Sequence, residues 1–156
     1  MHLVAAAEAS KKALTELIEP RMAQSKSERK SLGRIVIGTV AGDIHDIGKN
    51  IVASMLFAAG FEVHDLGKDI PTDQFIDKSK EVNANIVASS ALLSTTMPVQ
   101  SEIVKSLGAR GLRTKVKTMV GGAPVTQNWT NEIGADGFAE NAIEAVNVAK
   151  KLVATN

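Results

Sequence analysis

The chain has 156 residues, a length that suits one domain with room for a hydrophobic core. Its formal net charge is +1, so no strong overall field favours nucleic acid or an anionic membrane as a partner. It has no cysteine, which excludes disulfides, thiolate metal sites and a cysteine nucleophile, and suits a cytoplasmic protein. No apolar run is long enough to cross a bilayer, so the sequence predicts no membrane span.

The first part of the chain predicts a helix followed by a linker. Residues 3–22 carry apolar side chains at helical spacing, and Pro20 would end or bend that helix. Residues 23–31 are polar and lack any periodicity, as linkers do. We therefore expect two parts: a short N-terminal helix with its linker over residues 1–33, and a main domain over residues 34–156.

From residue 34 onward, strand and helix patterns alternate. Short β-rich apolar runs predict strands at Ile35–Val40, Phe61–Leu66, Asn85–Ser90, Val116–Val120 and Gly137–Ala139. Amphipathic runs predict helices at Gly48–Ala59, Thr72–Val82, Pro98–Arg110, Thr126–Ile133 and Ala142–Ala154. This alternation is typical of βαβ units, so the sequence predicts an α/β domain built on a parallel sheet.

The loop between the first predicted strand and the helix after it contains a candidate metal ligand. Loops at the carboxyl ends of strands are where open α/β sheets bind their ligands. His45 lies in this loop, and Asp43 is close enough in sequence to accept a hydrogen bond from one of its ring nitrogens. Such a bond fixes the tautomer and makes the other nitrogen a stronger metal donor. The alternative is a solvated or core histidine, with Asp43 accepting backbone N–H groups; we favour the metal ligand.

Other residues at the same edge fit a ligand site. Asp46 is expected to be the N-cap of the following helix rather than a ligand. Gly42 and Gly48 bracket the loop and permit close approach of a bulky ligand, although turn geometry explains them equally well. A slot beside the loop is predicted from residues that follow the third and fourth strands: Ser89, Ser90, Leu92, Ser94, Gly121 and Gly122.

Rival ligands fit this edge less well. A dinucleotide site would need Gly-x-Gly-x-x-Gly, a spacing that the glycines around this loop lack. A response-regulator phosphoacceptor would be an aspartate at the end of the third strand, where two serines stand. A flavin site usually offers an aromatic ring, and the candidate loops offer almost none. A zinc hydrolase needs about three N/O ligands, and the other two histidines are poorly placed to join His45.

Three motifs together resemble the cobalamin-binding domain family. Asp43-Ile44-His45-Asp46-Ile47-Gly48 resembles the family signature Asp-x-His-x-x-Gly. Ser90-Ala91-Leu92 resembles its Ser-x-Leu, and Gly121-Gly122 its Gly-Gly, in the family order and at similar separations. The resemblance runs from about residue 34 to the C-terminus. The longer string over residues 42–50 is similar to the methyltransferase branch, which includes methionine synthase and the corrinoid proteins of methanogens and acetogens.

The resemblance implies a flavodoxin-like fold, with a five-stranded parallel sheet and helices on both faces. It implies that cobalamin binds with its dimethylbenzimidazole displaced from the cobalt. His45 would take the lower axial position, with Asp43 as its hydrogen-bond partner. The metal ligand implied in this way is His45 alone.

The same resemblance assigns roles to the residues around the displaced nucleotide tail. Ser90 would form a hydrogen bond with the tail, and Gly121 and Gly122 would make room for it. Ser94 or Thr96 would lie near the lower face or complete the histidine–aspartate relay. The implied cofactor-binding residues are Gly42, Asp43, Ile44, His45, Asp46, Ile47, Gly48, Ser90, Leu92, Ser94, Thr96, Gly121 and Gly122.

The function implied is that of a corrinoid carrier subunit in a methyltransferase system rather than a stand-alone enzyme. It would shuttle a methyl group between a substrate-specific methyltransferase and an acceptor methyltransferase, with its cofactor alternating between cob(I)alamin and methylcobalamin. Two alternatives stay open. One is the small subunit of an adenosylcobalamin-dependent carbon-skeleton mutase, and the other is a non-enzymatic corrinoid-binding or sensor module. Neither nucleic acid nor a membrane is expected as a partner, and the methyl donor and the oligomeric state, homo-oligomer or not, are left open.

The predicted N-terminal helix resembles the final helix of the bundle that caps the methyl face of the corrinoid in this branch. That bundle has several helices, and only about thirty residues precede the main domain here. We therefore expect either a truncated cap or a cover supplied by partner chains.

Overall fold

The structure is a computed structural model that describes residues 31–155. The predicted N-terminal helix and most of its linker lie outside the described residues. Within residues 31–155, no helix is long and apolar enough to span a membrane.

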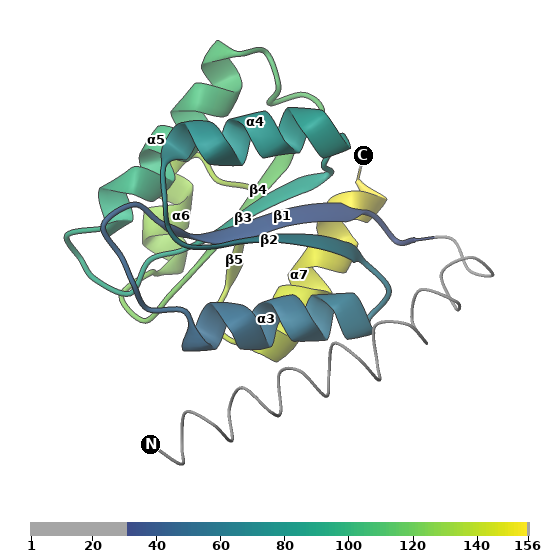
Figure 1. The fold of residues 1–156 in the computed structure, drawn as a ribbon, viewed down its shortest axis with the longest axis horizontal. Helices are drawn as coiled ribbons and strands as arrows, with labels where there is room; N and C mark the ends of the chain where they lie inside the picture. The colour runs from purple at the N-terminus through teal and green to yellow at the C-terminus, as the bar shows by residue number, and fades with distance from the viewer. Residues whose placement is uncertain (1–30, 156) are drawn as a thin grey trace. The chain divides into compact units, whose positions relative to one another are not determined.

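Five parallel strands form one sheet in the order β2-β1-β3-β4-β5 (Figure 1). The strands are β1 Arg34–Val40, β2 Glu62–Ile70, β3 Ile86–Ser90, β4 Lys117–Gly121 and β5 Gly137–Ala139. This confirms the predicted flavodoxin-like fold with its five-stranded parallel sheet. The chain passes from β1 outward to β2 and then returns across β1 to β3, so the order reverses between β1 and β3. In such sheets the crevice beside the carboxyl ends at this point is where ligands bind.

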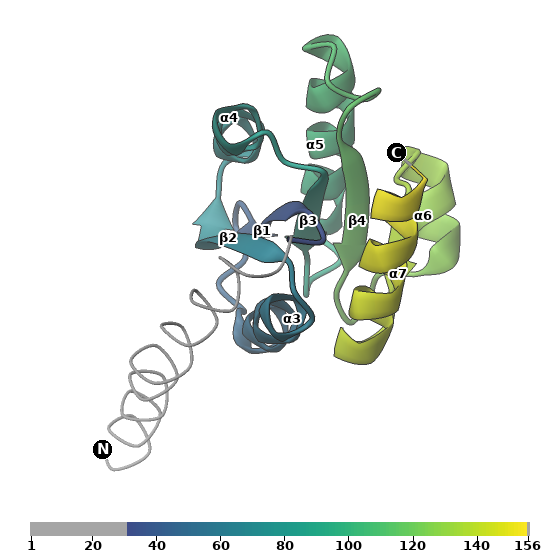
Figure 2. The same ribbon diagram turned by 90° about the vertical axis from the view of Figure 1, so that its right-hand side faces the viewer.

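In the described part of the chain, five helices connect and follow the strands, and each begins and ends within one residue of its predicted bounds. They are α3 Ile47–Ala58, α4 Thr72–Val82, α5 Met97–Ala109, α6 Gln127–Ile133 and α7 Ala142–Ala154. Helices α4 and α5 cover one face of the sheet, and α3 and α7 cover the other (Figures 1 and 2). Helix α6 lies beside the edge strand β5. The predicted placement of helices on both faces is therefore confirmed.

The central strand β1 supplies both halves of the core because successive side chains in a strand point to opposite faces. Val36 and Val40 pack in the cluster under α4 and α5. Ile35 and Ile37 pack in the cluster under α3 and α7. A strand buried on both faces is expected to be apolar throughout, as the run from residue 35 to residue 40 nearly is.

Strand β2 is longer than the sequence predicts. The prediction ended at Leu66, whereas β2 continues to Ile70. Its pairing with β1 shifts register twice, and both Gly67 and Asp69 have positive φ. Gly67-Lys68-Asp69 has the composition of a turn, but the bulges keep the chain paired with β1.

Candidate functional site

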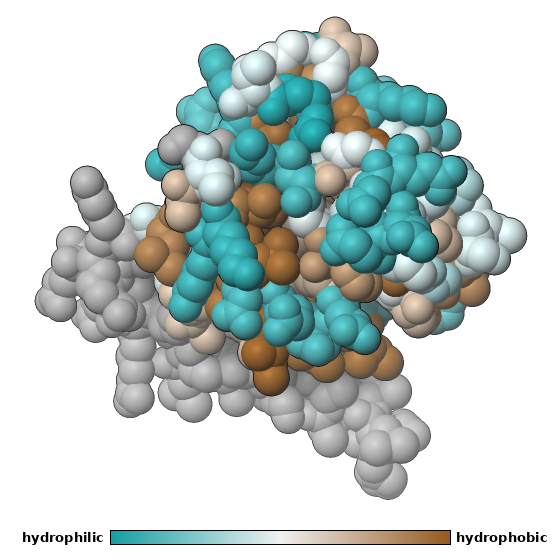
Figure 3. Space-filling model, turned by 180° about the vertical axis from the view of Figure 1, so that it is seen from behind, coloured by the Kyte–Doolittle hydropathy of each residue, from teal (hydrophilic) through white to brown (hydrophobic). Residues whose placement is uncertain are grey.

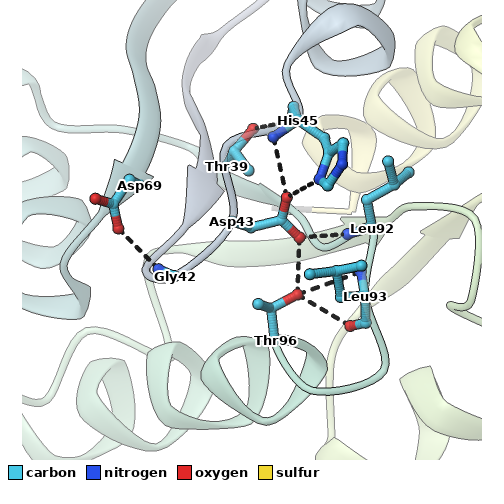
Figure 4. Close-up of polar contacts among 8 residues, drawn as sticks. All are labelled: Thr39, Gly42, Asp43, His45, Asp69, Leu92, Leu93 and Thr96. Atoms are coloured by element: carbon cyan, nitrogen blue, oxygen red, sulfur yellow. Dashed lines mark hydrogen bonds and ion pairs between the residues drawn. The ribbon is translucent and has the colours of Figure 1, made fainter.

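The loop that carries His45 begins with a tight turn after β1. The amide of Asp43 donates to the carbonyl of Val40 at 3.1 Å, and Gly42 has φ +84, in the left-handed region that favours glycine. The hydroxyl of Thr39 donates to the carbonyl of His45 at 3.0 Å, which holds the far side of the loop against the strand end. The loop is thus fixed over the carboxyl end of β1 (Figure 4).

A hydrogen-bonded relay runs from His45 through Asp43 to the loop after β3. One carboxylate oxygen of Asp43 lies 2.7 Å from Nδ1 of His45 and also accepts the His45 amide at 3.1 Å. The other oxygen accepts the amide of Leu92 at 2.7 Å and the hydroxyl of Thr96 at 2.8 Å (Figure 4). Since an ionised carboxylate only accepts hydrogen bonds, Nδ1 of His45 carries the ring proton. Nε2 is then the nitrogen with a free lone pair.

Asp43 and His45 differ sharply in burial. The Asp43 side chain is fully buried, whereas 47% of the His45 side chain is exposed. Burial alone would raise the pKa of Asp43, but the hydrogen bonds from the Leu92 amide, from His45 and from Thr96 outweigh it and lower the pKa to about 2. Asp43 is therefore ionised at neutral pH, and it orients an imidazole that points toward solvent.

Of the two hydroxyls that the sequence offered for the relay, Thr96 is the one that contacts Asp43. Thr96 is buried, and its Oγ1 also lies 2.9 Å from the carbonyl oxygen of Leu93. Ser94 is exposed, two residues earlier in the same loop. Leu92 contributes through its backbone amide, while its side chain stays partly exposed.

A cavity of about 770 Å³ opens beside the His45 loop at the carboxyl ends of the strands. Ser90, Gly121 and Gly122 line it, as the predicted slot requires. Most of the remaining loop residues predicted to bind the cofactor also line it, namely Ile44, His45, Asp46, Ile47, Gly48 and Leu92. Its apolar interior is formed by Ile37, Ala88 and Met119, one side chain from each of three neighbouring strands.

Both the backbone conformation and the close contact with Ala91 require glycine at position 122. It has φ +128, and a Cβ at this position would collide with the carbonyl oxygen of Ala91. The amide of Ala91 donates to the carbonyl of Gly121 at 3.1 Å, so the two strand ends are in direct contact here. The Gly-Gly pair lets β3 and β4 stay close together at the rim of the cavity.

The structure also shows the positions of Asp46, predicted to be the N-cap of α3, and of His64, a second histidine in the described part of the chain. Asp46 stands at the N-cap position of α3 as predicted, but its side chain makes no capping hydrogen bond. Its backbone has φ −130 and ψ 0, not the extended conformation of a typical N-cap. His64 lies in β2, partly buried, with Nε2 3.0 Å from Glu62, so it does not join His45. Within residues 31–155, no group of three or more His, Cys, Asp or Glu side chains could hold a metal ion.

Gln100 is a site residue that the sequence analysis missed. Its side chain is fully buried, and its Nε2 donates to the carbonyls of Ser89 at 3.1 Å and Gly121 at 3.2 Å. Its Oε1 accepts the indole N–H of Trp129 at 3.0 Å. Gln100 therefore ties together the ends of β3 and β4 at the cavity rim. A glutamine on the buried face of a helix, in line with Ile103, was the signal that could have identified it.

Comparisons with known proteins indicate the family to which this chain belongs. The model of the B12 binding domain family matches residues 33–147. Trimethylamine corrinoid protein 1 of Methanosarcina acetivorans is 54% identical over 152 residues, which are 97% of this chain and 70% of that protein.

Two solved structures are similar to this chain in both sequence and fold. A cobalamin-binding protein from Desulfitobacterium hafniense is 42% identical with a TM-score of 0.78, and the match covers 88% of this chain and 66% of that one. The methanol:cobalamin methyltransferase complex MtaBC of Methanosarcina barkeri contains a chain that is 31% identical with a TM-score of 0.81. That match covers 93% of this chain and 55% of the other. This chain thus spans about two thirds or less of those two structures. It belongs to the B12-binding domain family, as the three motifs predicted.

Proposed function

We propose that this chain is a methyltransferase corrinoid protein that holds cobalamin with His45 as the lower axial ligand, the benzimidazole of the cofactor being displaced. The observation that carries the proposal is the exposed imidazole of His45, fixed through Nδ1 by the buried Asp43 at 2.7 Å, at the mouth of a cavity of about 770 Å³. A histidine whose second nitrogen is bound by a carboxylate is the usual form of a metal-ligating histidine.

The cavity fits the displaced nucleotide tail of such a cofactor. It reaches from the His45 loop into the space between the sheet and helices α3 and α7, where apolar side chains suit an aromatic base. Polar groups stand nearer the carboxyl edge, among them the hydroxyls of Ser90 and Thr126. This arrangement supports the role of Ser90 as a hydrogen-bond partner of the tail and of Gly121 as a residue that leaves room for it.

When bound, the corrinoid would supply the chemistry of methyl transfer between two methyltransferases. The chain supplies binding, orientation and the axial nitrogen. Asp43 keeps the proton on Nδ1 of His45, so that Nε2 would be free to hold the metal. Thr96 and the Leu92 amide hold Asp43 in place, so the direction of the imidazole is fixed.

A methyltransferase is our proposed partner, because a chain of similar structure comes from a methanol:cobalamin methyltransferase complex. Exposed hydrophobic residues around His45 would be covered by the cofactor and by that partner. Within residues 31–155, five of the seven large hydrophobic side chains that are exposed lie in the His45 loop, in α3 or in the loop after β3: Ile44, Ile47, Ile51, Leu92 and Leu93. Figure 3 shows the molecule from behind, with hydrophobic patches in its lower part, which is where α3 lies in Figure 1. Contiguous exposed apolar surface marks an interaction site. The relative named as a trimethylamine corrinoid protein makes a methylamine our proposed methyl donor.

Substitution of His45, with substitution of His64 as a control, tests the proposal. The protein is loaded with hydroxocobalamin, and its visible spectrum is recorded together with the EPR spectrum after reduction to Co(II). We expect His45→Ala to remove the axial nitrogen coupling and the histidine-ligated spectrum. His64→Ala is the matched control, because His64 lies in β2 and pairs with Glu62, and it should leave both spectra unchanged. Unchanged spectra in His45→Ala would refute His45 as the ligand.

A further inference from the structure

The carboxyl-terminal part of β2 departs from regular strand geometry beside the His45 loop. Ile37 pairs with Asp65, Gly38 with Gly67 and Val40 with Ile70, so β2 has one extra residue at each of two places. Gly67 has φ +100 and Asp69 has φ 54. A left-handed backbone at a residue other than glycine costs free energy and persists only where its surroundings hold it, often at functional sites.

Asp69 holds the beginning of the His45 loop by two hydrogen bonds. Its carboxylate accepts the amide of Gly42 at 2.8 Å, and its own amide donates to the carbonyl of Asp43 at 2.9 Å. Figure 4 shows the Asp69 side chain directed at Gly42 from the strand beside the loop. These two bonds fix the backbone from which the Asp43 side chain extends toward His45.

Lys49 holds the other end of the loop. It lies in the first turn of α3, where a cation opposes the helix dipole, and its side chain is only 2% exposed. Its ammonium group donates to both carboxylate oxygens of Asp65 at 2.7 and 2.8 Å, and to the side chain of Asn50 at 2.6 Å. Asp65 also accepts the amide of Gly67 at 2.9 Å. The ion pair therefore joins the start of α3 to the irregular part of β2.

We propose that Asp69 and the Lys49–Asp65 ion pair are positioning residues that fasten both ends of the His45 loop to β2, and thereby set the height and angle at which Nε2 of His45 meets the cobalt. This inference rests on the proposed role of His45 as the axial ligand. Lys49 itself lines the cavity, but neither Asp65 nor Asp69 does so within the described part of the chain, so these two carboxylates act through the loop and not by contact with the cofactor. An edge strand made irregular by bulges commonly redirects a side chain toward a site in this way.

Asp69→Gly and Asp69→Asn form a matched pair, because both residues adopt the left-handed region readily but only asparagine can accept the Gly42 amide. In the cofactor-free protein, we expect the Gly42 amide of Asp69→Gly to exchange with solvent about fivefold faster, the size expected for one lost hydrogen bond. In the loaded protein, hydroxocobalamin should bind about fivefold more weakly, with a smaller fraction showing axial nitrogen coupling in the Co(II) EPR spectrum. Asp69→Asn should retain both properties.

Asn83→Gly is the control for the backbone change, since Asn83 has the same φ of 54 at the C-cap of α4, and it should leave cofactor binding unchanged. Asp65→Asn is the second variant, because it weakens the Lys49–Asp65 ion pair at a residue that does not line the cavity formed by the described residues. It too should lower the nitrogen-coupled fraction. Normal nitrogen coupling in both Asp69→Gly and Asp65→Asn would overturn this inference while His45→Ala still supports the axial ligand. A normal spectrum in His45→Ala would overturn both.

Discussion

The two faces of the sheet differ in the size of the side chains that fill them. Under α4 and α5, large side chains such as Phe75, Ile103 and Leu107 are buried against the central strands. Under α3 and α7, small residues are common, among them Ala88 and Ala145. The α3/α7 face retains a largely apolar cavity of about 770 Å³ at its carboxyl end.

The difference arises from side-chain volume and not from a missing helix. Helices α3 and α7 contact each other, as α4 and α5 do. Toward the amino end of the α3/α7 face, the large side chains of Leu56 and Phe61 are fully buried. Near the carboxyl edge, Gly48 and Ala142 stand where the cavity opens. One sheet therefore has a closed face that stabilises the domain and a second face that is left open for a ligand.

The largest expected effect is on the closed face. Phe75→Ala should lower the free energy of unfolding by about 3–5 kcal/mol, because the cavity left by a fully buried ring cannot be refilled by rigid neighbours. Phe138→Ala, at a partly exposed ring that lines the cavity on the open face, should cost less than about 2 kcal/mol. Urea unfolding of the cofactor-free protein measures both. Equal losses would show that the two faces are packed alike.

Enlarging an alanine on each face sharpens the comparison. Ala84→Leu places extra volume in the closed cluster and should destabilise the domain by about 1–3 kcal/mol through overpacking. Ala145→Leu extends into the cavity and should cost less than about 1 kcal/mol. The same change should weaken hydroxocobalamin binding by at least about tenfold, since it occupies the space of the nucleotide tail. Tight binding by Ala145→Leu would mean that the tail lies elsewhere.

The elements that the sequence predicted well are those with strong periodicity. The five helices within residues 31–155 lie within one residue of prediction because their apolar spacing and flanking strands agree. The contact between Asp43 and His45 was also predictable, since two residues separate them in one short loop. Asp43 accepts hydrogen bonds from backbone N–H groups as well, so both interpretations of that residue hold together.

Contacts between residues that are far apart in the sequence could not be predicted from it. Ser94 and Thr96 carry similar hydroxyls in one loop, and only the turn before α5 decides that Thr96 contacts Asp43. Asp69 lies in a stretch with turn composition, so its left-handed backbone and its bond to Gly42 required knowledge of the β1–β2 register. Such long-range pairings leave no local pattern in the sequence.

A smaller effect than that of Phe75→Ala is expected at Asp136, which lies at the amino end of β5 and does not line the cavity formed by the described residues. Burial raises the pKa of this carboxyl, but hydrogen bonds from Arg113 at 2.7 Å and from the Thr118 amide at 2.8 Å outweigh it and lower the pKa below its usual value. A lowered pKa means that the ionised group stabilises the fold above about pH 4, and that this contribution is lost as the pH falls further. Asp136→Asn should therefore reduce the free energy of unfolding by about 1–2 kcal/mol at neutral pH, with the difference shrinking in acid. Unfolding curves across pH measure this, and because Asp136 does not line the cavity formed by the described residues, corrinoid binding should be unchanged.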